Sequence, residues 1–179
     1  LLGFNMLDNI IEKEHSQPAL ILDKLNEEMV AAMTQEQFTD TPVKHGMDAA
    51  IISVDKQKME LEYAGAHNPL YYIRNGRLNE IKADKQAIGS FKEGEKITFQ
   101  NHLIKLEKGD VLYIFSDGFP DQIGGPNRKK FYYPPFKELL IFLHQLDMEE
   151  QKTSLDTTIT EWKGERDQTD DILVIGIRI

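Results

Sequence analysis

Residues 111–118 read Val-Leu-Tyr-Ile-Phe-Ser-Asp-Gly, an apolar run that ends in a carboxylate and a glycine. A short continuous apolar run bounded by turn-forming residues is typical of a buried strand. Residues 170–179 have the reverse order, since Asp-Asp precedes Ile-Leu-Val-Ile-Gly-Ile-Arg-Ile. The sequence therefore predicts two buried strands, 111–116 and 172–179, each with a carboxylate at one end.

These two strand ends are candidates for a metal site. If the strands are neighbours with suitable ends together, Asp117 and Asp170 converge, and converged carboxylates repel each other unless a cation lies between them. Mg²⁺ and Mn²⁺ both prefer oxygen ligands of this kind, and Gly118 would let the backbone approach the site closely. Each motif also has an ordinary interpretation. Asp-Gly after a strand is commonly a turn, and Asp170-Asp171 is also compatible with a solvated loop or a local cap.

The rest of the chain predicts helices first and then a series of strands. Asn75-Gly76 is the strongest hairpin signal, because both turn positions need positive φ. Hairpin-linked strands imply antiparallel sheet, and helices segregated from strands favour the α+β class. The predicted helices are 2–11, 17–35, 136–146 and 154–162. The predicted strands before residue 111 are 49–54, 59–63, 70–74, 77–81 and 97–106, the last of them with a break.

Composition excludes several classes of protein. With 40% hydrophobic and 28% charged residues, the 179-residue chain has an ordinary globular composition, which predicts one domain or part of a larger one. A net charge of −9 is unfavourable for nucleic-acid binding. The absence of cysteine excludes disulfides and zinc–thiolate sites and is consistent with a reducing compartment, so we predict a cytoplasmic location. No apolar run approaches the roughly 20 residues that cross a bilayer, so no membrane contact is predicted from this segment.

Five motifs carry a family resemblance, and they occur in the family's order. They are Ala64–Leu70 (AGAHNPL), Ala87–Gly89 (AIG), Lys108–Asp110 (KGD), Leu112–Gly125 (LYIFSDGFPDQIGG) and Asp170–Val174 (DDILV). They resemble, in turn, the "AGHNP", "PLG", "PGD", "TDG" and "DD-hydrophobic" motifs of SpoIIE-type phosphatases in the PPM (type 2C) superfamily. The resemblance implies the PPM fold, an antiparallel β-sandwich flanked by helices.

The resemblance also implies roles for individual residues. Asp117 and Asp170 match the family's metal-ligand aspartates, and Asp171 takes the place of a neighbouring Asp or Asn. Asp121 matches an acidic position shortly after the TDG motif. His67 matches the histidine of the AGHNP turn, where a lone histidine is more often a structural hydrogen-bonding group than a catalytic one.

Two family motifs do not occur in residues 1–179. The family's first half carries an aspartate on an early strand and a "DGHG/TGHG-VPGA" loop, and both help to hold the metal ions. Leu1-Leu2-Gly3 resembles the helix that follows that loop. We therefore expect residues 1–179 to be the C-terminal part of the domain, without its N-terminal strands, and the metal site to be incomplete in this chain.

The function implied is hydrolysis of phosphoserine or phosphothreonine on a bacterial signalling or regulatory protein, with a two-metal site of Mn²⁺ or Mg²⁺. The resemblance also implies an upstream sensor or regulatory domain. The alternative is a non-catalytic regulatory or partner-binding domain on the same scaffold. The apolar faces of helices 2–11 and 18–33 are a candidate partner surface, which could support a homodimer, and the basic residues 128–130 are a solvated loop or a contact for a phosphoprotein.

Overall fold

A computed structural model describes residues 10, 17–35, 46–91 and 96–179. The chain divides into two compact units, and each is treated by itself. Unit 1 comprises Leu1–Pro69 and Ile81–Leu106, and unit 2 comprises Leu70–Glu80 and Glu107–Ile179. Apart from Ile10, the predicted helix 2–11 lies outside the described residues.

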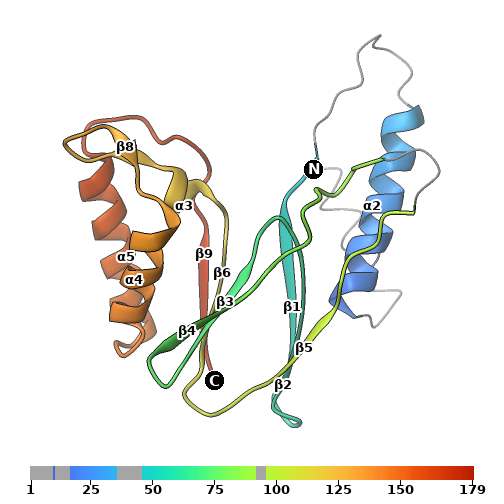
Figure 1. Cartoon of the computed structure of the whole chain (residues 1–179), viewed down its shortest axis with the longest axis horizontal. Helices are drawn as coiled ribbons and strands as arrows, with labels where there is room; N and C mark the ends of the chain where they lie inside the picture. Colours follow the sequence, from blue (N-terminus) through green and yellow to red (C-terminus); the bar gives the residue numbers. More distant parts are fainter. Residues whose placement is uncertain (1–9, 11–16, 36–45, 92–95) are drawn as a thin grey trace. The chain divides into compact units, whose positions relative to one another are not determined.

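In the part of unit 1 that the structure describes from residue 17 on, a helix packs on a three-stranded antiparallel sheet (Figure 1). The helix is α2 (Pro18–Gln35), and it begins at a proline, which is tolerated in the first turn. The strand order is β1-β2-β5, with β1 at Ala49–Asp55, β2 at Glu60–Ala66 and β5 at His102–Lys105. The last strand is much shorter than the predicted 97–106.

The apolar face of α2 lies in the core of unit 1. Leu22 and Leu25 are 0% and 1% exposed, and they belong to one cluster with Ala64 and Ala66 of β2. Within the described part of α2, Leu20 is the exposed large hydrophobic residue. The prediction that this face of residues 18–33 forms a partner surface is therefore wrong, because the unit's own sheet covers it.

Unit 2 contains a four-stranded antiparallel sheet with the order β4-β3-β6-β9. Strands β3 and β4 occupy the predicted ranges, and Asn75 and Gly76 between them have φ values of 51° and 71°. The antiparallel sheets and segregated helices confirm the α+β class. The strands span Leu70–Arg74 (β3), Arg77–Ile81 (β4), Val111–Phe115 (β6) and Val174–Arg178 (β9).

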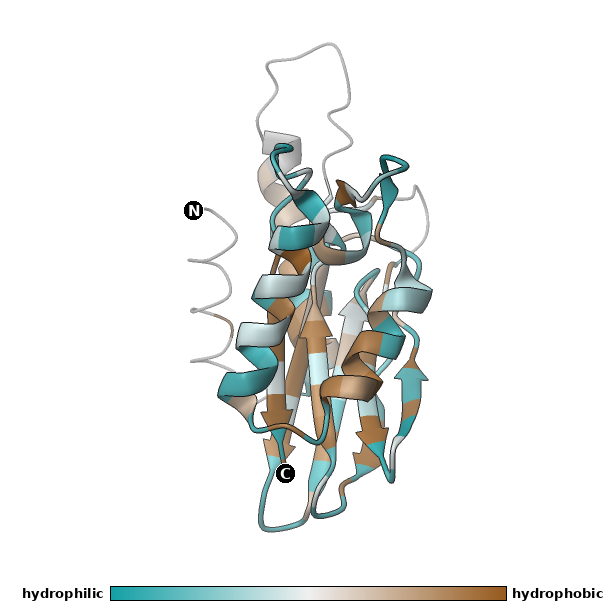
Figure 2. Ribbon diagram, turned by 90° about the vertical axis from the view of Figure 1, so that its left-hand side faces the viewer, coloured by the Kyte–Doolittle hydropathy of each residue, from teal (hydrophilic) through white to brown (hydrophobic). Residues whose placement is uncertain are grey.

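Helices cover one face of this sheet. Tyr113 and Phe115 of β6 are buried against Phe136 and Leu140 of α4, and Figure 2 shows the hydrophobic residues concentrated in the strands. The helices are α3 (Gly118–Asp121), α4 (Tyr133–Leu143) and α5 (Met148–Lys163), and a two-stranded sheet joins β7 (Ile123–Gly124) to β8 (Lys129–Lys130). None of the described helices is long and apolar enough to cross a membrane.

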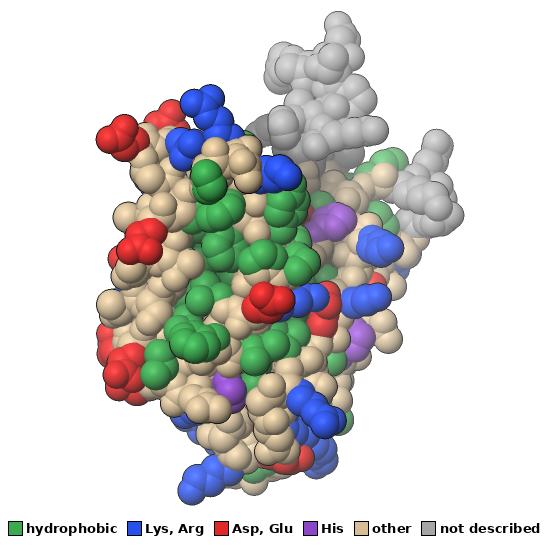
Figure 3. All heavy atoms as spheres, turned by 60° about the vertical axis from the view of Figure 1, so that its left-hand side comes forward, with side chains coloured by type: hydrophobic (Ala, Val, Ile, Leu, Met, Phe, Trp, Pro, Cys, Tyr) green, Lys and Arg blue, Asp and Glu red, His purple; other side chains and the backbone are tan. Residues whose placement is uncertain are grey.

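Strand β9 is less buried than predicted. It ends the strand order of its sheet, and Leu173 and Ile175 are 56% and 41% exposed. The apolar run predicted full burial, but successive side chains of a strand point to opposite faces of the sheet. Ile172 and Val174 pack against the core cluster of unit 2, whereas Leu173 and Ile175 point to the opposite face. Figure 3 shows a face of the molecule on which hydrophobic side chains gather among charged ones.

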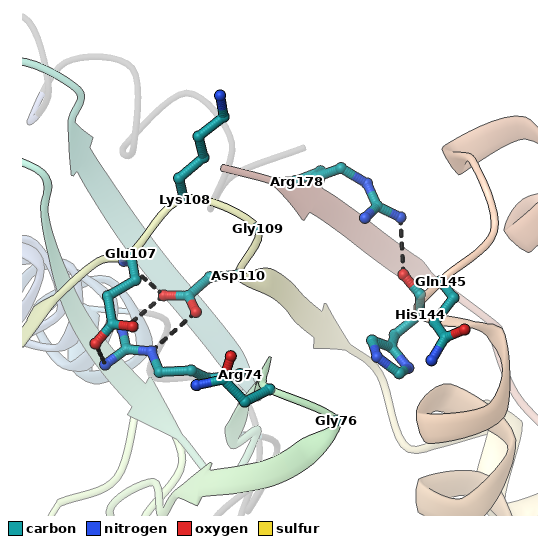
Figure 4. Close-up of a pocket in the computed structure, with 10 residues that line it drawn as sticks. Arg74, Gly76, Glu107, Lys108, Gly109, Asp110, His144, Gln145 and Arg178 are labelled. Atoms are coloured by element: carbon teal, nitrogen blue, oxygen red, sulfur yellow. Dashed lines mark hydrogen bonds and ion pairs between the residues drawn. The ribbon is translucent and has the colours of Figure 1, made fainter.

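The KGD motif forms a buried ion pair at the start of β6 (Figure 4). Asp110 is 1% exposed and accepts hydrogen bonds from Arg74 Nε at 2.9 Å, Arg74 Nη2 at 2.6 Å and the Glu107 N–H at 2.9 Å. Burial raises the pKa of Asp110, but the hydrogen bonds from Arg74 and Glu107 outweigh it and hold that pKa below its ordinary value.

Gly109, with φ of 94°, makes the turn into the strand. The pair lines a polar cavity of about 330 Å³, whose other lining residues include His144, Gln145 and Arg178.

Candidate metal centre

The two predicted carboxylate motifs lie at the same edge of the unit 2 sheet. Strands β6 and β9 pair antiparallel with Phe115 opposite Val174, so the end of β6 meets the start of β9. The pairing continues one residue further, because the Ser116 N–H donates to the Leu173 carbonyl at 3.0 Å. Asp117 follows this junction on one side, and Asp170-Asp171 precede it on the other.

Gly118 allows the two segments to approach each other. A Cβ atom at this position would lie 2.3 Å from the Asp171 carbonyl oxygen and 2.8 Å from its carbon. Both atoms are backbone, so a neighbouring side chain cannot relieve the clash by changing rotamer. Gly118 is therefore required by the close approach of the Asp171 backbone.

We expect Gly118→Ala to weaken the junction. Forcing a methyl group into a packed site costs about 1–3 kcal/mol, and here the backbone of residue 171 must move away. Chemical unfolding followed by the fluorescence of Trp162, the chain's single tryptophan, measures the loss in unit 2. Gly176→Ala is the matched control, because the nearest atom to its new methyl is the flexible Met148 Cε at 2.6 Å. Equal stability of the two variants would contradict the prediction.

The carboxylates differ in environment. Asp117 is half-buried, whereas Asp170 and Asp171 are exposed. One oxygen of Asp170, Oδ1, accepts the Asp171 N–H at 2.7 Å, and the Asp170 carbonyl accepts the Gln168 side-chain amide at 2.7 Å. Both bonds are local, so they fix the conformation of this segment around Asp170 without attaching it to β6.

Asp121 has a different partner. Its Oδ2 lies 2.7 Å from Nζ of Lys130 on β8. The hydrogen bond from Lys130 to Asp121 raises the pKa of Lys130, and the charges of Asp121 and then Asp117 raise it further. Lys130 therefore lies within the electrostatic reach of Asp117, and Asp121 is the carboxylate that pairs with it. The family resemblance matched Asp121 to an acidic position, but nothing in the sequence indicated its ion pair with Lys130.

His67 belongs to unit 1 and is exposed, with φ of 61°. Its N–H donates to the Asp84 carbonyl at 2.9 Å, and the Tyr63 hydroxyl donates to the neighbouring Asn68 carbonyl at 2.8 Å. These contacts hold the backbone of the AGAHNP turn, while the imidazole ring reaches solvent. They involve the backbone of the turn, so the structural hydrogen-bonding role of the His67 side chain stays a prediction.

The donor set suits a hard divalent ion, since Asp117, Asp170 and Asp171 offer carboxylate oxygens. Within the ranges that the structure describes, however, no group of three or more His, Cys, Asp or Glu side chains is arranged to hold a metal ion. These residues fit part of a Mn²⁺ or Mg²⁺ site, whose remaining positions would be filled by water or by further oxygen ligands.

The family model for stage II sporulation protein E (SpoIIE) matches residues 3–179. The chain belongs to the SpoIIE family. The SiaA-PP2C domain of Pseudomonas aeruginosa is 29% identical with a TM-score of 0.86, and the match covers 99% of this chain and 68% of that one. No protein with a curated description matches the sequence.

Two more distant structures share the fold of this SpoIIE-family chain and were determined with metal. The Bacillus subtilis SpoIIE phosphatase domain, presoaked with Mn, is 18% identical with a TM-score of 0.61, covering 98% of this chain and 71% of that one. The catalytic domain of the serine/threonine phosphatase PstP, in complex with two manganese ions, is 14% identical with a TM-score of 0.67, covering 98% and 77%. Relatives of this fold therefore bind manganese.

Proposed function

We propose that this SpoIIE-family chain is a metal-dependent protein serine/threonine phosphatase domain that acts on a bacterial signalling or regulatory protein. The observation that carries the proposal is the junction of β6 and β9, which brings Asp117 and Asp170-Asp171 to one edge of a sheet. Membership of the SpoIIE family supports it. The PPM β-sandwich remains the fold that we predict for the arrangement of the two units.

Asp117 and Asp170 would hold the metal, with Asp171 and the Gly118 backbone beside them. When bound, Mn²⁺ or Mg²⁺ lowers the pKa of a water molecule and neutralises phosphoryl oxygens. The chain's own contribution is to fix its carboxylates on rigid backbone. Asp117 directly follows the strand residues buried under α4, and Gly118 permits the contact with residue 171.

We assign Asp121 a supporting role and predict its effect on metal affinity. Asp121→Asn would leave the charge of Lys130 uncompensated near Asp117. Mn²⁺ affinity should then fall by no more than about twofold to fivefold, because solvent screens a surface charge interaction. Titration of Mn²⁺ by electron paramagnetic resonance measures the change. The double variant Asp121→Asn/Lys130→Gln should recover the wild-type affinity, whereas a loss that persists in it would make Asp121 a metal ligand.

The proposed partners follow from the family, and the proposed location follows from the absence of cysteine. We propose a phosphoprotein substrate, an upstream sensor or regulatory domain and a cytoplasmic location. A structure of B. subtilis SpoIIE includes its PP2C domain with a fragment of a regulatory domain, which supports the second of these. A homodimer remains a hypothesis, and its surface would have to lie elsewhere than on the buried face of α2.

The second candidate is a non-catalytic partner-binding domain on the same scaffold. It is favoured by one observation, namely that the described residues alone do not assemble three metal-ligating side chains. Under this alternative the junction of β6 and β9 would serve only to stabilise the fold.

The test is Mn²⁺-dependent hydrolysis of a phosphoserine peptide by the full-length natural protein that carries this sequence. We expect phosphate release with Mn²⁺, its loss on chelation with EDTA and its return when Mn²⁺ is restored. A folded protein that releases no phosphate from several phosphoserine and phosphothreonine peptides, with either Mn²⁺ or Mg²⁺, would overturn the phosphatase proposal and favour the binding domain.

A further inference from the structure

The side chain of Ser116 bridges two segments that are more than fifty residues apart in the sequence. Its hydroxyl donates to the Asp171 carbonyl at 2.6 Å and accepts the Leu173 N–H at 3.0 Å. A hydroxyl has one proton to donate and lone pairs that accept, so both bonds can exist together. With its own N–H on the Leu173 carbonyl, Ser116 makes three hydrogen bonds to the two residues that flank Ile172.

This bridge attaches the candidate ligand segment to β6. The regular strand pairing ends at Phe115 and Val174, and the hydrogen bonds of Asp170 are local. The Asp171 carbonyl is the attachment on the β9 side of the carboxylates, since it accepts the Ser116 hydroxyl and lies against Gly118. On the other side of Asp170, Thr169 is hydrogen-bonded to Gln122 and Ile123. The hydroxyl therefore fixes the backbone between the strand end and the carboxylates of Asp170 and Asp171.

We propose that Ser116 is a positioning residue for the metal site. It holds the Asp170-Asp171 backbone beside Asp117 before metal binds and touches neither metal nor substrate. The inference rests on the proposed function. Removing a group that orients metal ligands typically weakens metal binding by about tenfold to a hundredfold, because binding must then also order the ligands. The exposure of Asp170 and Asp171 points to the lower end, so we expect about tenfold.

The test compares Ser116→Ala with Ser116→Thr in the full-length protein. Threonine retains the hydroxyl, so it should keep Mn²⁺ affinity near the wild-type value, while alanine should weaken it about tenfold in an electron paramagnetic resonance titration. In the metal-free protein, amide hydrogen exchange at Leu173 should be faster in Ser116→Ala than in Ser116→Thr. At saturating Mn²⁺, kcat should be close to wild type in both. Ser53→Ala, an exposed change in unit 1, is the control.

The outcomes separate this inference from the proposed function. If the wild type binds Mn²⁺ and Asp117→Asn does not, but Ser116→Ala binds like the wild type with unchanged Leu173 exchange, only the positioning role is overturned. If the wild-type protein and Asp117→Asn both fail to bind Mn²⁺ or Mg²⁺, the proposed function fails and the inference fails with it. Equal weakening by alanine and threonine would also overturn it, because the hydroxyl would then not be the responsible group.

Discussion

Asp110→Asn is expected to destabilise unit 2 by about 2–3 kcal/mol at neutral pH, because the buried carboxylate is lost while Arg74, which is 23% exposed, keeps its contact with Glu107. Asp110 is 1% exposed and accepts two hydrogen bonds from Arg74 and one from the Glu107 N–H. An asparagine would remove the charge and turn an amide donor toward the donors around it. Chemical unfolding followed by Trp162 fluorescence measures the loss in this unit.

Glu107→Gln is the matched control, because Glu107 contacts the same guanidinium. Its carboxylate lies 2.9 Å from Arg74 Nη1, but its side chain is 60% exposed. Solvent screens such a pair, so its loss should cost no more than about 1 kcal/mol. Similar losses in the two variants would contradict the assignment of Asp110 as the stabilising partner.

The same pair predicts how the stability of unit 2 depends on pH. The pKa of Asp110 is lower in the folded protein than its ordinary value, so the folded state favours the ionised form. The stabilisation is then fully present above the unfolded pKa of about 3.9 and is lost as pH falls through the lower folded value. The difference in unfolding free energy between wild type and Asp110→Asn should therefore shrink below about pH 4.

Local signals predicted the elements that depend on local interactions. Strands β3 and β4 begin and end where the sequence placed them, because the Asn75-Gly76 turn fixes their register. Helix α5 begins at Met148, six residues before the prediction, because Asp147 and Glu150 form a capping box ahead of a mostly polar helix. The Asp-x-x-Glu spacing of this capping box is visible in the sequence, but the prediction followed apolar periodicity, which is weak in this helix.

Elements that depend on distant contacts were harder to predict. The small sheet of β7 and β8 lies beside Trp162, whose indole N–H donates to the Gln122 carbonyl at 3.0 Å. The ion pair of Asp121 with Lys130 follows from that sheet. Neither could be read from spacing, since both depend on how α5 packs against the segment after β6.

The candidate site shows the same division. The residue types and the strand ends were apparent in the sequence. The prediction of a shared site depended on β6 and β9 being neighbours, and only the structure shows that they pair. The bridge from Ser116 to residues 171 and 173 could not be predicted, although a hydroxyl next to a strand end is a common local hydrogen-bonding group. Its partner lies 55 residues away, so the bridge exists only once the strands have paired.

Asp117→Asn is expected to lower Mn²⁺-dependent phosphatase activity by more than about a hundredfold, since groups that merely orient ligands cost tenfold to a hundredfold. Asparagine has the same shape and removes the negative charge beside Asp170-Asp171, so metal affinity should fall while the fold persists. Phosphopeptide hydrolysis at increasing Mn²⁺ measures the effect, and Mn²⁺ binding gives a readout that does not depend on turnover.

Asp156→Asn is the matched control, because Asp156 lies exposed on α5 and the substitution makes the same change in charge. It should leave activity and Mn²⁺ affinity unchanged, so an equal loss would make the effect of Asp117→Asn one of net charge.

The pair of variants also separates the two candidate functions. A partner-binding domain would keep its affinity for a phosphoprotein partner when Asp117 becomes asparagine, with or without Mn²⁺. A phosphatase would lose turnover with that single change while its unfolding, followed at Trp162, stays close to wild type, because the proposed role of Asp117 is metal binding and the core cluster of unit 2 consists of apolar side chains.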